Sequence, residues 1–194
     1  MTPPLLGLRE RKRAETHGRI QAEAMRLFIE RGFDATTIDE IAEAANVSRR
    51  SLFDYFGTKE EIVFSTKAGF PDNLAEAIAR RPADEPLLDM VENAMTDMVD
   101  HLLTPQSYAV ARLISETPAL SAGDKAKYEI IERVLAAALA GRKGLAATDL
   151  GCRVAASTAI GIMKLTIEAW LADQGAEPEV FGKAAFDALR QMAR

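Results

Sequence analysis

The sequence predicts an all-α protein, with an N-terminal three-helix domain followed by a larger helical domain, about nine to ten helices in total. Apolar residues recur three and four positions apart, as in the segment 20–28, and no strand-like alternation occurs. A chain of 194 residues can hold a small domain joined to a larger one. We place the first domain at residues 1–57, with residues 1–8 as a mobile arm, and the second at residues 58–194.

Two short helices joined by a tight turn are predicted within residues 36–59. Thr37 and Glu40 have the spacing of a capping box, followed by one apolar face made of Ile38, Ile41, Ala42 and Ala45. Asn46 tolerates the left-handed backbone that such a turn needs, and Ser48 is suited to cap the next helix. This arrangement is a helix-turn-helix.

The second of these helices has one face for packing and one for contact with DNA. At 100° per residue, Leu52 and Phe56 fall together, while Arg50 and Asp54 lie nearly opposite them. Arginine pairs with guanine in the major groove, and an apolar edge meets the thymine methyl group. We therefore expect base contacts from Arg50, Ser51 and Phe53, although Phe53 has the alternative of packing against the first helix.

Asp54 is less suited to a surface that faces phosphates. It either accepts a hydrogen bond from cytosine or holds Arg50 at i, i+4 spacing, and we favour the second role. Lys59 follows the Thr58 cap at the start of another helix, where a cation and free amides attract phosphate. The complete set of expected DNA-binding residues is Thr36, Thr37, Ser48, Arg49, Arg50, Ser51, Phe53, Asp54, Tyr55 and Lys59. The basic run at residues 9–13 either follows the DNA backbone or minor groove or is simply solvated.

Further helices are expected in the second domain, with breaks near Pro71, near Pro105 and between Gly175 and Pro178. Small residues in the penultimate helix would let another helix approach closely: Ala155, Ala156, Ala159 and Gly161. The predicted segments are 58–69, a shorter piece ending at 82, then 87–102, 107–116, 119–140, 148–174 and 177–193.

The chain resembles the TetR family of bacterial transcriptional regulators between residues 9 and 62. The resemblance lies in LFIERGFDATTIDEIA (27–42), AANVSRRSLF (44–53) and DYFGTKEEI (54–62). It implies a dimer in which the last two helices of each chain form a four-helix bundle, and a phosphate contact by Lys59. We call the second helix of the helix-turn-helix the reading helix. In such a dimer the two reading helices, one from each chain, lie about 34 to 36 Å apart, which is one turn of DNA, so the operator should be an inverted repeat.

The charge and the cysteine content exclude several classes of protein. The net charge is −5, with 10 basic and 9 acidic residues in 1–59 against 14 and 20 in 60–194, which disfavours a sequence-blind nucleic-acid binder. Cys152 is the only cysteine, so no disulfide framework or cysteine metal cluster is possible. The longest apolar run, residues 154–163, is about half of a membrane span. We expect a soluble, cytoplasmic protein without metal, cofactor or membrane partner.

An effector pocket in the second domain would be lined by aromatic and methionine side chains with one cation. These residues are as typical of plain core packing, and Arg112 with Glu116 is as typical of a surface pair. The candidates are Phe64, Met90, Met95, Met98, Tyr108, Arg112, Met163 and Trp170.

The function that best fits these features is that of a ligand-responsive dimeric repressor, released from a palindromic operator by a small, lipophilic effector. One alternative is an all-helical enzyme or lipid-binding protein without DNA binding. The sequence gives this alternative little support. His17 and His101 are the only histidines, and no nucleophile–base pair, metal-ligand spacing or phosphate-binding glycine loop is evident. A second alternative is a DNA-binding regulator without an effector.

Overall fold

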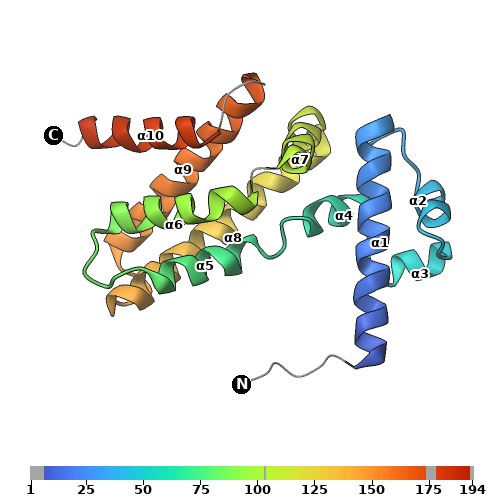
Figure 1. Cartoon of the computed structure of the whole chain (residues 1–194), viewed down its shortest axis with the longest axis horizontal. Helices are drawn as coiled ribbons and strands as arrows, with labels where there is room; N and C mark the ends of the chain where they lie inside the picture. The colour runs from blue at the N-terminus through green and yellow to red at the C-terminus, as the bar shows by residue number, and fades with distance from the viewer. Residues whose placement is uncertain (1–6, 103, 174–177, 193–194) are drawn as a thin grey trace. The chain divides into compact units, whose positions relative to one another are not determined.

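The protein is described by a computed structural model that covers residues 7–102, 104–173 and 178–192 (Figure 1). Within these ranges every regular element is a helix, which confirms the all-α prediction. Most of the predicted N-terminal arm, residues 1–6, lies outside the described residues, as does the break predicted at Gly175. The helices are α1 (Leu8–Arg31), α2 (Ile38–Ala44), α3 (Arg49–Phe53), α4 (Lys59–Ser65), α5 (Phe70–Arg80), α6 (Leu87–Leu102), α7 (Pro105–Glu116), α8 (Pro118–Lys143), α9 (Leu150–Ala172) and α10 (Pro178–Met192).

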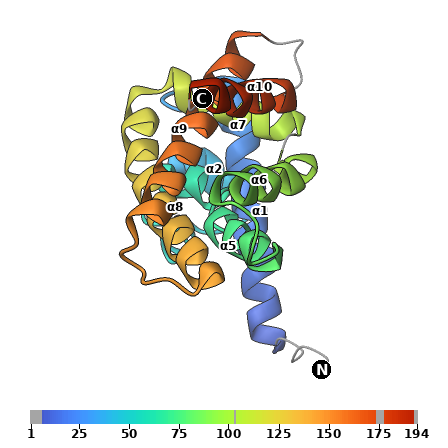
Figure 2. The ribbon, with the colours of Figure 1, turned by 90° about the vertical axis from the view of Figure 1, so that its left-hand side faces the viewer.

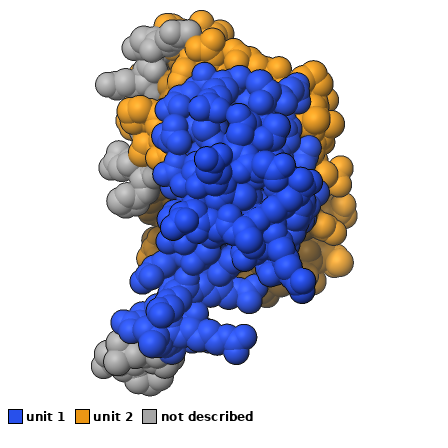
Figure 3. Space-filling model, turned by 90° about the vertical axis from the view of Figure 1, so that its right-hand side faces the viewer, with its two compact units in different colours: residues 1–68 blue, residues 69–194 orange. Residues whose placement is uncertain are grey.

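The chain forms two compact units, residues 1–68 and residues 69–194 (Figure 3). The boundary therefore lies after α4, whereas the predicted division at residue 57 placed it before α4. Ile62 and Val63 of α4 are completely buried, and α4 packs on α1 within the first unit. Burial of these two side chains is the physical reason why α4 belongs to the N-terminal unit.

The first unit is built on the apolar face of α1, where Ile20, Ala24 and Phe28 are fully buried. The predicted caps are formed in the structure. The Thr37 hydroxyl accepts from the Glu40 amide at 3.3 Å, while a Glu40 carboxylate oxygen accepts from the Thr37 amide at 2.8 Å. These bonds satisfy two amides that the helix itself leaves unpaired, so they define where α2 begins.

Helix α5 is longer than the sequence suggested. The segment after residue 69 was expected to be the shorter of two pieces, but α5 has 11 residues and α4 has 7. Pro71 lies in the first turn of α5. Proline is tolerated there because its missing N–H would have no helical partner, so Pro71 starts a helix instead of interrupting one.

The second unit is a helical bundle (Figure 2). It has one continuous apolar core. Helix α8 packs against α5 and α9, and α10 packs against α9 and α6. The core takes residues from all five of these helices, including Leu74, Met90, Leu139, Ala156 and Phe186. Cys152 is part of this core, and burial raises the pKa of its thiol.

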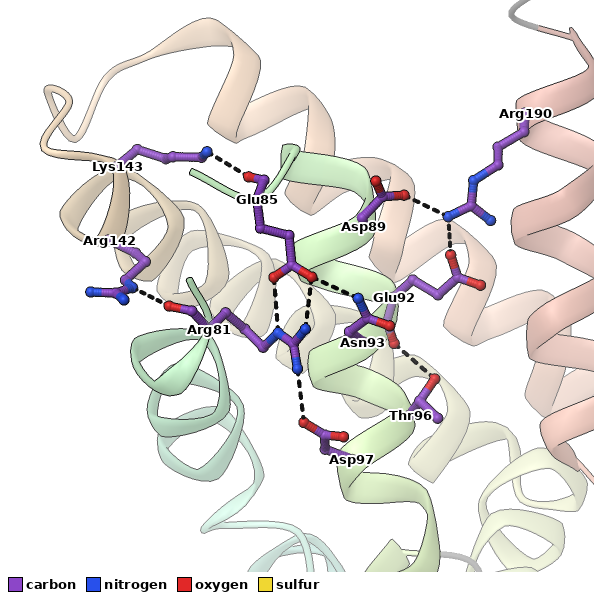
Figure 4. A network of polar contacts seen from close by, with 10 residues as sticks. All are labelled: Arg81, Glu85, Asp89, Glu92, Asn93, Thr96, Asp97, Arg142, Lys143 and Arg190. Carbon is purple, nitrogen blue, oxygen red and sulfur yellow. Dashed lines mark hydrogen bonds and ion pairs between the residues drawn. The ribbon is translucent and has the colours of Figure 1, made fainter. Parts of the chain in front are cut away.

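A polar network closes the turn between α5 and α6 against the end of α8 (Figure 4). The Arg81 guanidinium donates to the Glu85 carboxylate at 2.7 Å, and this contact lowers the pKa of Glu85. Lys143 donates to the carbonyl oxygens of Ala83 and Glu85, at 2.8 and 2.5 Å. Arg142 donates to the Arg81 carbonyl. The cations at the end of α8 thus satisfy carbonyl groups of the turn.

Helix α10 is joined to α6 by a second charged contact. The Arg190 guanidinium donates to Asp89 at 2.7 Å and also to Glu92, and these two carboxylates raise its pKa (Figure 4). Phe186, one turn earlier in α10, is 3% exposed. The inner face of α10 is therefore held by both packing and charge.

Candidate nucleic-acid interface

Helix α3 is anchored from its inner side. Leu52 is fully buried and Phe56 is 3% exposed. The Ser48 hydroxyl accepts from the Ser51 amide at 3.0 Å and so caps the first turn. Asn46, in the turn before α3, has a φ of 51°, the left-handed conformation expected of it. A five-residue helix cannot persist alone, so these contacts are what give α3 a defined orientation.

One contact that supports this turn was missed in the sequence. The Arg19 side chain of α1 donates to the carbonyl oxygen of Ala45, at 2.8 Å. The two residues are 26 positions apart, so no local pattern reveals the bond. The bond ties α1 to the C-terminal end of α2.

The outer surface of α3 carries exposed cationic and aromatic side chains. Arg49 and Arg50 are exposed, Ser51 is half-buried and Phe53 is 44% exposed. The Arg49 guanidinium lies 5.8 Å from the centre of the Phe53 ring. Phe53 therefore does not have the buried position that packing against the first helix would give it. Contact of these residues with base edges stays a prediction, and their exposure is what such contact requires.

The ion pair found in this region differs from the one predicted. Arg49 pairs with Asp39 of α2 at 3.1 Å, whereas no hydrogen bond or ion pair joins Arg50 to Asp54 in the described part of the chain. Asp54 instead follows α3, where its backbone amide donates to the Arg50 carbonyl at 3.1 Å. The Asp54 carboxylate is exposed, so its role in cytosine recognition stays a prediction.

Lys59 has a structural role that the sequence did not reveal. Its ammonium group donates to the carbonyl oxygens of Phe33 and Thr36, at 2.9 and 2.8 Å, and lies 4.5 Å from the centre of the Phe33 ring. Two of its three hydrogens are thus used to hold the connection between α1 and α2. A phosphate contact through the third stays a prediction.

Thr36 was assigned to the DNA-binding set, and the structure corrects this assignment. Its side chain is 1% exposed, and its hydroxyl donates to the carbonyl of Gly32 at 2.9 Å. A hydroxyl buried in this way cannot reach a phosphate. Thr37 and Ser48 are exposed, but their hydroxyls cap α2 and α3. Tyr55 is half-buried, with the Arg13 guanidinium 5.5 Å from its ring centre.

The candidate effector residues are spread over several environments. Met90 and Met98 are buried in the core of the second unit, with Met95 packed against it. Phe64 is buried in the first unit. Arg112 is exposed and pairs with Glu116 at 2.7 Å, as in a surface pair. Tyr108 of α7 and Trp170 of α9 form an edge-to-face pair 5.0 Å apart, and both, like Met163, are half-buried. Apart from Met95, which packs against the core, these last three are the candidates that combine apolar character with partial access.

Helices α9 and α10 also carry an apolar surface that the single chain leaves uncovered. Leu150, Val154 and Leu165 of α9 are 69%, 56% and 60% exposed, and Val180 and Met192 of α10 are 60% and 78% exposed. Gly161 lies between Val154 and Leu165, and a Cβ added there would meet no atom within 4 Å. Of the other small residues expected to form a seam, Ala156 and Ala159 are buried in the chain's own core, and Ala155 packs against it.

Helix α9 is also long and apolar enough to span a bilayer by length and composition, within the residues described. A core helix of a globular protein satisfies the same criteria, so this observation is weak by itself. Only 28% of its most apolar window is buried within the chain. The exposed residues of the helix include Leu150, Val154 and Leu165.

Comparison with known proteins identifies the family. Residues 20–66 match the N-terminal model of the tetR family of bacterial regulatory proteins, and residues 85–194 match the MftR C-terminal domain. The chain belongs to the TetR family. The first match contains all of α2, α3 and α4, in agreement with the first compact unit.

Relatives that the chain matches over most of its length are described as transcriptional regulators. A putative mycofactocin biosynthesis transcriptional regulator, MftR of Mycobacterium tuberculosis, is 32% identical over 187 residues, 92% of this chain and 91% of the relative. TcmR of Streptomyces glaucescens is 31% identical over 156 residues, 76% of this chain and 69% of the relative. The fold is that of Bacillus subtilis FadR crystallised with stearoyl-CoA, with a TM-score of 0.61, 19% identity, and coverage of 89% of this chain and 97% of FadR.

Proposed function

We propose that this TetR-family regulator is a homodimeric repressor that binds an inverted-repeat operator through α3 and leaves it when a small, lipophilic effector binds the second unit. The observation that carries the proposal is the two-sided character of α3. Leu52 is fully buried, while Arg50 and Phe53 are presented to solvent. An exposed phenylalanine beside arginine gains little in water but matches the thymine methyl and guanine edges of the major groove.

The uncovered apolar surface of α9 and α10 supports a homodimer through the last two helices. The α9 stripe of Leu150, Val154, Ser157, Gly161 and Leu165 contains no charged residue, and its spacing of three and four positions places it on one face of the helix. A two-fold axis would pair each stripe with its own copy. The same axis would place two copies of α3 on successive major grooves of a palindrome.

An effector would act by favouring a conformer in which the reading helices no longer match the DNA. The half-buried Met163, Tyr108 and Trp170 are the residues we assign to its site, because the other methionine candidates are committed to core packing. The fold shared with FadR in its stearoyl-CoA complex supports a lipophilic ligand. To shift the operator from mostly bound to mostly free, the effector must prefer the released state by about 10⁴-fold, about 5.5 kcal/mol.

A binding assay with and without candidate effectors tests the proposal. The full-length protein is titrated against labelled duplexes from the region flanking its own gene, in the presence of long-chain acyl-CoA thioesters or other lipophilic compounds. We expect one duplex to be bound specifically and at least one compound to release it. The variant R50A/F53A should lose specific binding and keep its helical content, because neither side chain is buried.

The outcomes separate the alternatives. Failure to retain any duplex would favour the enzyme or lipid-binding alternative. Specific binding that no compound alters would favour a regulator without an effector. Trp170 is the only tryptophan, so quenching of its fluorescence by a releasing compound would locate the ligand near the Tyr108 pair.

A further inference from the structure

Two arginines begin α3, and their side chains differ in what they contact. Arg49 pairs with Asp39 in the first turn of α2, and its Nη1 atom lies 3.2 and 3.1 Å from the two carboxylate oxygens. The Arg49 guanidinium also lies 5.8 Å from the centre of the Phe53 ring. The Arg50 side chain forms no hydrogen bond or ion pair with the residues that the structure describes. Of the two arginines, Arg50 alone presents an uncommitted guanidinium.

Fold stability is a weak reason for the Asp39–Arg49 pair. The Arg49 and Asp39 side chains are 61% and 68% exposed, and an ion pair exposed in this way contributes little to stability. The start of α2 does not depend on the pair either. The capping box of Thr37 and Glu40 already satisfies free amides there, and the Glu40 carboxylate supplies negative charge to the first turn. The effect of the pair therefore lies in the chemistry of the α3 surface.

The pair changes how that surface meets phosphate. A free arginine beside a reading helix binds phosphates of any duplex, which adds affinity for every sequence and carries no information about bases. Arg49 reaches a phosphate only by leaving Asp39, and the unpaired carboxylate is then repelled by the same phosphate. Arg50 and Phe53 are unaffected by this restraint. The pair thus lowers the sequence-independent part of the affinity and leaves the base-reading side chains free.

The pair also gives the Phe53 ring a fixed neighbour. Phe53 is 44% exposed, so core packing alone does not set the orientation of its ring. A guanidinium at 5.8 Å lies within the range of attraction between a cation and an aromatic face. Asp39 holds this guanidinium from α2, a different helix. A ring held in one orientation meets a thymine methyl group without losing rotamer freedom at the moment of binding.

We infer that Asp39 is a positioning residue that sets the sequence specificity of this protein: it withholds Arg49 from the DNA phosphates and holds it against Phe53. The inference rests on the proposed DNA-binding function and deepens it, because Asp39 lies outside the set of residues expected to contact DNA. Loss of the Asp39 carboxylate should increase binding to random DNA and reduce the preference for the operator. Specificity depends on this ratio because non-specific sites on a genome greatly outnumber operators.

The expected effect can be expressed as a salt dependence. Each phosphate contact contributes about 0.9 to the slope of log affinity against log salt, so release of Arg49 in both subunits steepens the slope by about 1.8. Between about 200 and about 50 mM salt, this corresponds to an additional gain in affinity of about 12-fold on any duplex. Loss of one methyl contact by Phe53 weakens binding to the operator by about fourfold per half-site.

The test compares Asp39→Asn with Asp34→Asn, which removes the same charge from another exposed residue of the same unit. The Asp34 side chain has no ion pair or hydrogen bond within the described ranges, so this control reports the general effect of one negative charge fewer. Each protein is titrated at several salt concentrations against two duplexes of about 40 base pairs, one random and one carrying a site that the wild type selects. We expect Asp39→Asn to steepen the slope by about 1.8 more than Asp34→Asn does.

A double variant shows whether Arg49 is the group that is released. In a protein that already carries Arg49→Gln, the addition of Asp39→Asn should change the slope no more than Asp34→Asn does. Equal slopes for Asp39→Asn and Asp34→Asn would overturn the inference, provided that thermal melts show both proteins folded. The same additional steepening in the absence of Arg49 would overturn it as well.

Deoxyuridine in place of single thymines of the selected site tests the orientation of Phe53. The wild type should lose about fourfold per half-site at the thymine that Phe53 contacts, and Asp39→Asn should lose less. Equal losses would overturn the role of Asp39 in holding Phe53. If the wild type selects no site, the proposed function itself fails. If it selects a site and Asp39→Asn behaves as Asp34→Asn does, only the inference about Asp39 fails.

Discussion

Replacement of Leu165 by aspartate tests whether the uncovered face of α9 is the dimer interface. Leu165 is 60% exposed in the single chain. It lies one helical turn after Gly161, the residue at which a second helix could approach α9 most closely. A carboxylate there would have to be desolvated against an apolar partner. The dimer should therefore dissociate, while each chain keeps its fold because Leu165 adds little to its own core.

The magnitude follows from the exposed fraction. Complete burial of a leucine side chain contributes about 1.5 to 3 kcal/mol, so covering the exposed part of Leu165 contributes about 1 to 2 kcal/mol per subunit. Two-fold symmetry doubles this to about 2 to 4 kcal/mol. At 1.4 kcal/mol per tenfold, the dimer dissociation constant should rise by about 30- to 700-fold, before the desolvation of the new carboxylate is added.

Sedimentation velocity over a range of protein concentrations measures this change. Ile130→Asp is the matched control, since Ile130 is an exposed residue of the same unit, 48% accessible, on α8. The control should dimerise as the wild type does. A Leu165→Asp protein with an unaltered dissociation constant would refute the assignment of the interface to α9. If both variants dissociated equally, the interface would not be specific to α9 and would involve α8 as well.

Three further predictions concern single side chains. Lys59→Met should lower the free energy of unfolding by about 2 kcal/mol in urea titrations, because two carbonyls lose a charged donor, and unchanged stability would contradict the bracing role. Asp54→Ala should change which operator bases are preferred in competition assays, whereas an equal gain on all sequences would show that Asp54 only repels DNA. Arg81 lowers the pKa of Glu85, so this carboxylate stabilises the fold above the ordinary glutamate pKa of about 4.3 and loses that contribution as pH falls through its lowered value. Glu85→Gln should therefore show a smaller fall in melting temperature than the wild type between about pH 5 and about pH 3, and equal falls would exclude this linkage.

The helix-turn-helix could be predicted from sequence because its determinants are local. Capping by Thr37 and Glu40, the left-handed Asn46 and the spacing of Leu52 and Phe56 depend on hydrogen bonds and periodicities within about four residues. The same local reasoning correctly separated the buried face of α3 from its exposed face. Most of the residues predicted to contact DNA were chosen on that basis, and the family resemblance came from the same segment.

The environment of the remaining residues depended on contacts between distant segments. Lys59 has the sequence context of a phosphate ligand, yet it holds carbonyls 23 and 26 residues away, and the Thr36 hydroxyl is buried among backbone groups. Ala156 and Gly161 look alike in a small-residue pattern, but only Gly161 faces away from the core. The sequence by itself determined which segments are helical and which residue types each helix presents. The tertiary structure decided which polar groups are already satisfied and which surfaces stay open, because burial and hydrogen-bond partners are set by packing between helices far apart in the chain.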